Sequence, residues 1–304
     1  MIALLAGSSL LGGCGGEDAT PASEPVTVVP GNGSPAAGAA SPLVVAKPAT
    51  SWMNFALAFQ YIGAQFYTVA SGSSGMSSAL RGGIGVQGDL KGGRQVTFTD
   101  PYLGQYAAEF AADQNAAIAQ MRVQLGAAAG AQPTIDLSPT AFGPIGRATS
   151  LGSGFDPFSG DTSFLFGGLI LEHAVAGVYR AMLTAGVVGD ADDILTKAIG
   201  DSVYRDGLIR AMLASKAQDD PSLSATISSV FTALAGLEAS NAASQEPQTV
   251  DQTSSSVSDG GGHAIALTRS PSEAFRLLYL NVNGTTGGLL PAGVNGVELL
   301  PGLQ

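Results

Sequence analysis

The sequence has few cysteines, histidines and charged side chains, and each shortage excludes a class of function. Cys14 is the one cysteine, so an intramolecular disulfide and a cysteine-based metal site are both excluded. Lysine and arginine together number 13, the net charge is −11, and no basic cluster exists. This charge argues against a nucleic-acid partner and against electrostatic docking on anionic lipid. The 45% of hydrophobic residues allows a large buried core.

The N-terminal segment is apolar and ends in small residues directly before Cys14, as the h-region and cleavage site of an export signal do. The order Leu11, Gly12, Gly13, Cys14 resembles a bacterial lipoprotein processing box, in which the cysteine is acylated. We therefore expect residues 1–14 to be a lipoprotein-type signal segment and Cys14 to be the lipidation site. The expected location is the periplasm or the outer membrane, with a lipid anchor as the membrane contact.

The next segment, residues 15–48, is rich in Pro, Gly, Ala and Ser and has few aromatics. Such a composition buries too little apolar surface to offset the entropy of ordering, so we expect a flexible tether. Residues 49–304 would then form the folded domain.

Hydrophobic residues in the domain recur at intervals of three and four, which predicts helices. Asp100 and Pro101 predict the start of the second helix, Gly126 its end, and Ser270 with Glu273 a capping box for the last. Residues 82–99 are expected to form a short hairpin or loop, and residues 127–160 a long crossover. The helices are expected at about 50–70, 101–125, 161–183, 190–216, 221–242 and 273–281.

The stretch 164–183 is apolar on nearly all sides and carries one acid, Glu172, next to His173. A helix of this kind is either buried in a large protein or spans a membrane. Because Glu172, His173 and Arg180 interrupt the apolar run, we interpret it as a central core helix.

Five segments, taken together, resemble an exported ferritin-like domain family that includes the plant desiccation-related proteins. The resemblance implies an all-α fold: a ferritin-like four-helix bundle with a long crossover between its second and third helices, extra C-terminal helices and an extended tail. In such bundles, two helices each give a Glu and the other two each give a Glu-x-x-His pair, which together hold two metal ions. The five segments are residues 54–67, 96–126, 155–183, 203–213 and 269–296.

At the positions that match these ligands, the chain carries one carboxylate. The matching residues are Gln60, Gln114, Ala117, Glu172, Ser202 and Arg205. Neutral amides are poor ligands for iron or manganese, and a guanidinium places a permanent positive charge at the site. The resemblance therefore predicts vestigial positions that hold no metal, and no other cofactor is expected.

A lone buried carboxylate is unfavourable unless it is paired, and Arg205 falls on the facing helix. We predict a buried Glu172–Arg205 ion pair with Gln60 and Gln114 as flanking hydrogen-bond partners. The alternative is that Arg205 extends to solvent and Glu172 is protonated.

The sequence favours a non-catalytic, exported ferritin-like protein that serves as a cell-envelope scaffold or binding module, with a link to desiccation or stress protection. No catalytic residue is expected. The alternative is a di-metal oxidase, ferroxidase or catalase-like enzyme with ligands drawn from Glu109, Asp113, Glu172, His173 and Asp201. Self-association through a charge-poor bundle face is a third hypothesis. Residues 83–88 match the Gly-x-Gly-x-x-Gly pattern of dinucleotide-binding sites. Such a site needs a helix directly after the pattern, and the sequence predicts none there, so we do not expect a dinucleotide to bind.

Overall fold

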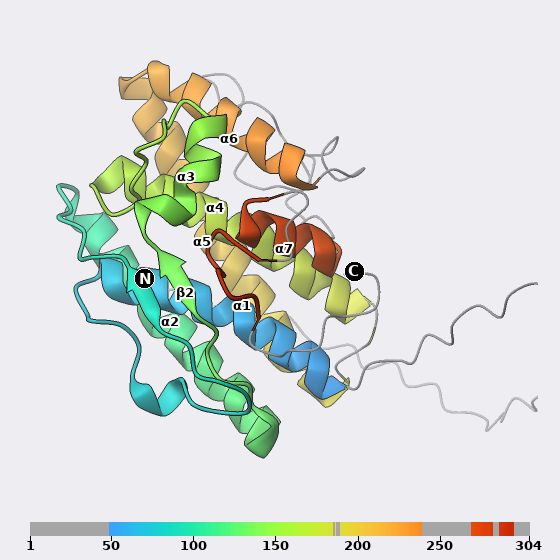
Figure 1. The fold of residues 1–304 in the computed structure, drawn as a ribbon. Coiled ribbons are helices and arrows are strands. Elements are labelled where there is room, and N and C mark those ends of the chain that lie inside the picture. Colours follow the sequence, from blue (N-terminus) through green and yellow to red (C-terminus); the bar gives the residue numbers. More distant parts are fainter. Residues whose placement is uncertain (1–48, 185, 187–188, 239–268, 282–285, 295–304) are drawn as a thin grey trace, which may run out of the picture. The chain divides into compact units, whose positions relative to one another are not determined.

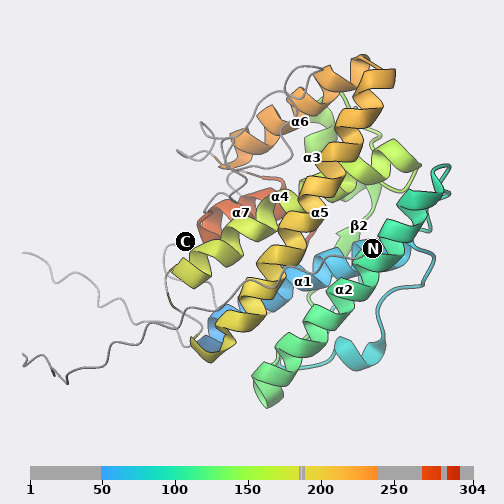
Figure 2. The same ribbon diagram turned by 180° about the vertical axis from the view of Figure 1, so that it is seen from behind.

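Four long helices form an antiparallel bundle in the computed structural model, which describes residues 49–184, 186, 189–238, 269–281 and 286–294. α1 packs against α2 and α4 packs against α5, while α1 also contacts α4 and α2 contacts α5 (Figures 1 and 2). The predicted all-α bundle is confirmed. Its helices are α1 (Ala49–Ala70), α2 (Pro101–Leu125), α4 (Asp161–Thr184) and α5 (Asp192–Asp219).

The core of the bundle is built from α1 and α4, whose side chains are buried along almost their whole length. Aromatic rings link the two helices, and the rings of Phe66 and Phe164 stack with centroids 5.6 Å apart. Among the described residues, α4 is the one helix long and apolar enough to cross a membrane, and 89% of its most apolar window is buried. The interpretation of this stretch as a central core helix is therefore confirmed.

Local capping signals set the predicted helix ends. The Asp100 side chain accepts a hydrogen bond from the backbone N–H of Tyr102, and Pro101 follows at the first helical position. Gly126 ends α2 with φ of 55°, a backbone conformation that favours glycine. Ser270 and Glu273 form the expected capping box before α7 (Pro271–Tyr279). These three predictions are confirmed.

The crossover between α2 and α4 contains structure that the sequence did not reveal. It holds β2 (Ile135–Leu137) and α3 (Pro139–Ala148), and α3 packs against α6 (Ser222–Glu238). Of the two alternatives predicted for residues 82–99, the hairpin is wrong, because β1 (Leu90–Gly92) pairs in parallel with β2, and most of the segment is loop. Short 3₁₀ helices η1, η2 and η3 cover Ser78–Leu80, Gly126–Ala128 and Gly189–Ala191.

Close backbone contact explains the glycine pattern at 83–88. A Cβ atom on Gly83 would lie 2.2 Å from the carbonyl oxygen of Ala129, and one on Gly88 would lie 2.1 Å from the backbone nitrogen of Thr134. The segment before α2 therefore runs against the segment after it at a distance that only glycine permits. These glycines serve packing between two extended segments.

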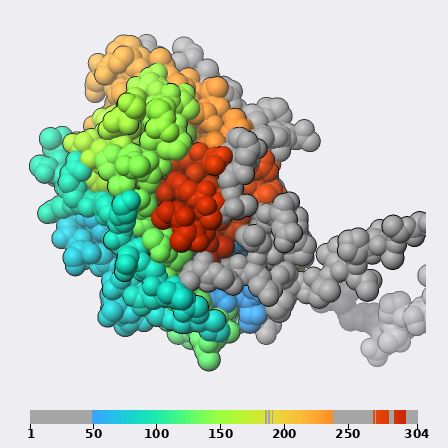
Figure 3. Space-filling model, viewed as in Figure 1, coloured from blue at the N-terminus to red at the C-terminus, as the bar shows by residue number. Residues whose placement is uncertain are grey.

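The described C-terminal segment, residues 286–294, packs against the crossover between α2 and α4. Leu289 and Leu290 are fully buried. The Leu289 carbonyl accepts a hydrogen bond of 3.0 Å from the backbone N–H of Asp136 in β2. Figure 3 shows this segment, in red, against the green crossover. The predictions for Cys14, for residues 1–48 and for the tail beyond residue 294 lie outside the described residues.

Candidate functional site

The centre of the bundle contains a buried ion pair. Glu172 of α4 is 2% exposed and Arg205 of α5 is 1% exposed. Arg205 Nε donates to Glu172 Oε1 at 2.7 Å, and its terminal nitrogen donates to Oε2 at 3.4 Å. The predicted pair is confirmed, and the alternative in which Arg205 extends to solvent is wrong.

Two hydroxyl groups complete the environment of the carboxylate. Tyr67 of α1 donates to Glu172 Oε1 at 3.0 Å, and Ser202 of α5 donates to Oε2 at 2.7 Å. Ser202 lies one turn before Arg205, so both side chains project from the same face of α5. Each carboxylate oxygen thus accepts two hydrogen bonds, one of them from the guanidinium.

The electrostatics of the cluster favour a charged pair beside neutral phenols. Burial opposes the charge of Arg205, but the adjacent Glu172 carboxylate outweighs it and raises the pKa of the guanidinium. Burial and the charge of Glu172 raise the pKa of the Tyr67 phenol well above its ordinary value. Tyr67 is therefore a hydrogen-bond donor that stays protonated far above neutral pH.

The two glutamines lie in the interior, but their predicted hydrogen bonds to the pair are wrong. Gln60 and Gln114 are each 2% exposed, and the Oε1 atom of each has no hydrogen-bond partner within the described part of the chain. The Gln60 side chain instead lies beside the phenol of Tyr179 and lowers its pKa against the larger, raising effect of burial. Tyr67 and Ser202 take the places beside the carboxylate that were expected for the glutamines.

The family follows from comparison with known sequences. A model of the ferritin-like domain matches residues 49–214, which is more than half of the chain and takes in α1, α2, α4 and most of α5. The chain belongs to the ferritin-like domain family. No curated protein and no solved structure matches the chain.

The residues inside this ferritin-like bundle do not fit a di-metal centre. Among the described residues, no group of three or more His, Cys, Asp or Glu side chains could hold a metal ion. Ala117 offers no donor atom, and both oxygens of Glu172 already accept hydrogen bonds from Arg205. A dication at this place would also meet a guanidinium 2.7 Å from its one carboxylate ligand.

The ligands proposed for the enzymatic alternative do not come together in the ferritin-like domain. Glu109 is exposed and accepts a hydrogen bond of 3.3 Å from Tyr204. Asp201 pairs with Lys197 at 2.8 Å near the surface. Asp113 is half-buried on α2, whereas His173 is fully buried in α4.

A second polar cluster, which the sequence analysis missed, surrounds His173. Arg210 Nε donates to Asp206 at 2.8 Å, and its guanidinium carbon lies 4.6 Å from the centre of the Phe231 ring. Terminal nitrogens of Arg210 and Arg269 lie 3.4 and 3.2 Å from the two ring nitrogens of His173. The spacing of Asp206 and Arg210, four residues apart on one helix, was the available signal.

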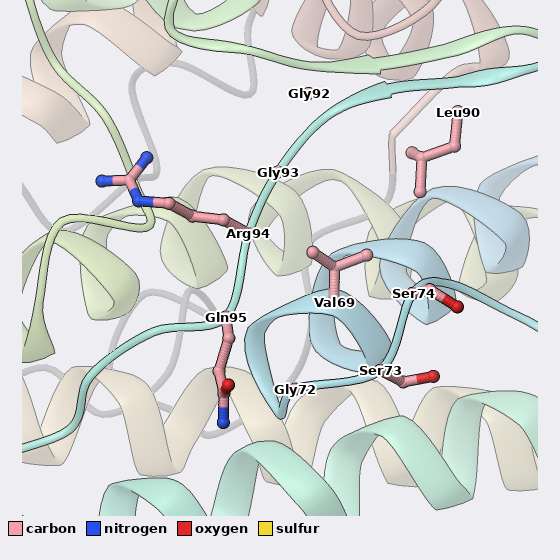
Figure 4. Close-up of a pocket in the computed structure, with 9 residues that line it drawn as sticks. All are labelled: Val69, Gly72, Ser73, Ser74, Leu90, Gly92, Gly93, Arg94 and Gln95. Atoms are coloured by element: carbon pink, nitrogen blue, oxygen red, sulfur yellow. The ribbon is translucent and has the colours of Figure 1, made fainter.

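A surface cleft of about 400 Å³ lies at the C-terminal end of α1. Its uncharged polar side chains are Ser73, Ser74 and Gln95, and glycine backbone forms much of the wall. Figure 4 shows the Arg94 side chain pointing away from the two serines, and it pairs with Asp156. Within the described ranges, no His, Cys, Asp or Glu lines the cleft, so this lining suits a neutral polar ligand and offers no base for a serine nucleophile.

Proposed function

We propose that this chain is a non-catalytic ferritin-like domain protein of the cell envelope, which serves as a scaffold or binding module. The Glu172–Arg205 pair carries the proposal, because it places a permanent cation in the interior of the bundle, beside the one carboxylate found at the positions that match the metal ligands. Relatives with a di-metal site need carboxylates and imidazoles there. In this chain a protein cation takes the role of the metal charge.

The residues at the matching positions also support the loss of a metal site. By the resemblance of the sequence, Gln60, Gln114 and Ser202 replace glutamates, while Ala117 and Arg205 replace histidines. Exchanging a carboxylate for an amide keeps the shape of the side chain but removes the negative charge that hard cations prefer. These two exchanges, together with the serine at position 202 and the loss of both imidazoles, leave too few ligands for two dications.

Metal analysis of the purified full-length protein tests this proposal. After expression in medium supplemented with iron and manganese, we expect far less than one ion per chain by plasma mass spectrometry. A reverse variant with Gln60→Glu, Gln114→Glu, Ala117→His and Arg205→His should gain bound metal. A control variant with the first three changes and Arg205 retained should not. Two iron or manganese ions per wild-type chain would contradict the proposal and favour the enzymatic alternative.

The envelope location rests on the export pattern before Cys14. We propose that Cys14 carries the lipid and that residues 15–48 hold the domain away from the membrane. Palmitate should label the wild-type protein in cells, and the Cys14→Ala variant should remain unlabelled. Equal labelling of the two proteins, or none in either, would rule out the anchor.

The resemblance to desiccation-related proteins suggests protection during drying, and the cleft beside α1 supports a binding role. A strain lacking the protein should survive drying less well than its parent. If the folded bundle is required for protection, the Arg205→Ala variant expressed in that strain should not restore survival. Equal survival of the two strains would remove the stress role but leave the metal and anchor proposals intact.

A further inference from the structure

The outer face of the bundle where α2 lies beside α5 exposes tyrosine side chains. The two helices contact each other and run side by side in the view of Figure 2. Tyr102 of α2 is 65% exposed and Tyr204 of α5 is 47% exposed. Tyr106 lies one turn after Tyr102, so the two side chains project from the same side of α2. Tyrosine is enriched in protein–protein interfaces relative to the rest of the protein surface, so this face is a candidate contact surface.

Ring contacts join the tyrosines of the two helices into one surface. The ring of Phe110 stacks with that of Tyr106, and it meets the Tyr204 ring edge to face, with centroids 6.2 Å apart in both contacts. Phe110 is 1% exposed, so it supports both rings from the bundle side. A surface that is ordered in this way before binding loses less entropy when a partner docks.

Two carboxylates of α2 lie beside the same tyrosine. Tyr204 donates a hydrogen bond of 3.3 Å to Glu109 Oε1. Partial burial raises the pKa of the Tyr204 phenol, and the negative charges of Glu109 and Asp113 raise this pKa further. Glu109 and Asp113 are four residues apart on α2, and like charges at that spacing repel. Because α2 has no lysine or arginine before Arg122, this part of the face is negatively charged.

The combination of rings and carboxylates defines the chemistry of a partner. An aromatic ring attracts a cation placed over its face, and the cation is more often a guanidinium than an ammonium. Arginine can stack its planar group on a ring and pair with a carboxylate through two parallel hydrogen bonds. A metal ion fits less well, because the part of the chain that the structure describes contains no group of three or more His, Cys, Asp or Glu side chains that could hold one. The face is therefore best matched to arginine.

We propose that this face, formed by Tyr102, Tyr106, Glu109, Asp113 and Tyr204, docks an arginine-rich segment of a partner protein. A guanidinium lies over the Tyr204 ring and pairs with the adjacent carboxylates, which relieves the repulsion between them. The net charge of −11 draws a basic segment towards the domain before contact. The inference rests on the proposed role as a binding module and gives that role a partner of defined chemistry.

Fluorescence anisotropy of labelled peptides with the full-length protein tests the docking face. The probes are short peptides that alternate glycine with arginine, with lysine, or with citrulline, a neutral analogue of arginine. At low salt, the wild-type protein should bind the arginine peptide about fivefold more tightly than the lysine peptide and should not bind the citrulline peptide. No binding of the arginine peptide, or equal binding of the arginine and lysine peptides, would overturn the proposal.

Matched variants separate the face from the overall negative charge. Glu109→Gln and Tyr204→Leu should each weaken binding of the arginine peptide by about tenfold, whereas Tyr204→Phe keeps the ring and should weaken it less. The control is Asp219→Asn, which removes the same charge as Glu109→Gln from an exposed position at the C-terminal end of α5 and should leave the dissociation constant unchanged. Equal effects of Asp219→Asn and Glu109→Gln would overturn the proposal.

The peptide comparison with wild-type protein does not depend on how the variants fold. Circular dichroism shows whether each variant keeps its helices, and substitutions at these partly exposed positions should preserve them. Because peptide binding is measured directly, its failure would leave the metal and anchor proposals intact, and bound metal in the wild-type protein would leave the docking face intact.

Discussion

Removing Arg205 is the most direct test of how the interior is stabilised. Arg205→Ala leaves the 2%-exposed Glu172 with two neutral donors, Tyr67 and Ser202, and no cation. An uncompensated buried charge of this kind costs about 3–5 kcal/mol. Because a folded protein is stable by only about 5–15 kcal/mol, this loss is a large fraction of the total. A shift of about 2–4 °C for each kcal/mol lowers the melting temperature by roughly 10 °C.

Urea unfolding followed by the fluorescence of Trp52, the one tryptophan, measures the loss. The matched control on the same helix is Lys197→Ala, which removes the surface pair with Asp201. That pair is worth less than about 1 kcal/mol. If Arg205→Ala and Lys197→Ala lower the unfolding free energy equally, the buried pair does not stabilise the bundle as described here.

A double variant separates the charge effect from packing. Glu172→Leu with Arg205→Met replaces both charges by apolar groups of similar length. Replacing a buried ion pair in this way is often neutral or stabilising, so the double variant should recover most of the stability that Arg205→Ala loses. If the double variant loses as much as the two single variants combined, the pair acts through shape and not through charge.

Three further predictions concern other parts of the domain. Gly88→Ala should lower the unfolding free energy by about 1–3 kcal/mol, since its Cβ atom would meet the Thr134 backbone. Gly200→Ala, at a position on α5 with open space around it, should raise the unfolding free energy by about 0.5–1 kcal/mol. Equal effects of the two substitutions in urea titrations would contradict the contact between residue 88 and the Thr134 backbone. Burial raises the pKa of the Tyr67 and Tyr179 phenols, so the folded state keeps protons that the unfolded state releases above about pH 10. The contribution of these phenols to the unfolding free energy is therefore fully present below that pH and is lost as the pH rises above it. Absorbance at 295 nm should show that the two phenols ionise only when the protein unfolds. Burial opposes ionisation of Asp161, but hydrogen bonds from Thr99 and Asp100 outweigh it and lower its pKa, so its contribution is present above about pH 4 and is lost in acid. Asp161→Asn should flatten the acid limb of the stability curve, and an unchanged limb would contradict this.

The sequence was sufficient where local chemistry decides the structure. Asp100, Gly126 and Ser270 mark helix ends because their side chains or backbone angles act within one turn. The Glu172–Arg205 pair was also predictable, because the resemblance puts Arg205 at a ligand position on the helix that faces Glu172, and a lone buried acid requires a cation. The helix ends depend on residue type and on periodicity alone.

The elements that were missed depend on contacts between distant residues. α3 contains Pro144 and two glycines, Gly143 and Gly146, so its intrinsic helix propensity is low and packing against α6 supports it. β1 and β2 are three residues each, too short for an alternating pattern. The glutamine contacts were wrong because helical spacing gives the face of a residue but not the torsion angles of its side chain.

The parallel pairing of β1 with β2 has a consequence for the mobility of α2. β1 precedes α2 in the chain and β2 follows it. The pairing of the two strands therefore holds together the two ends of the chain segment that contains α2. α2 cannot swing outward or transfer to a second molecule unless the strand pair separates first. Amide protons in α2 should therefore exchange no faster than those linking Leu90–Gly92 to Ile135–Leu137, and glycines far from the bundle centre would govern when its interior becomes accessible.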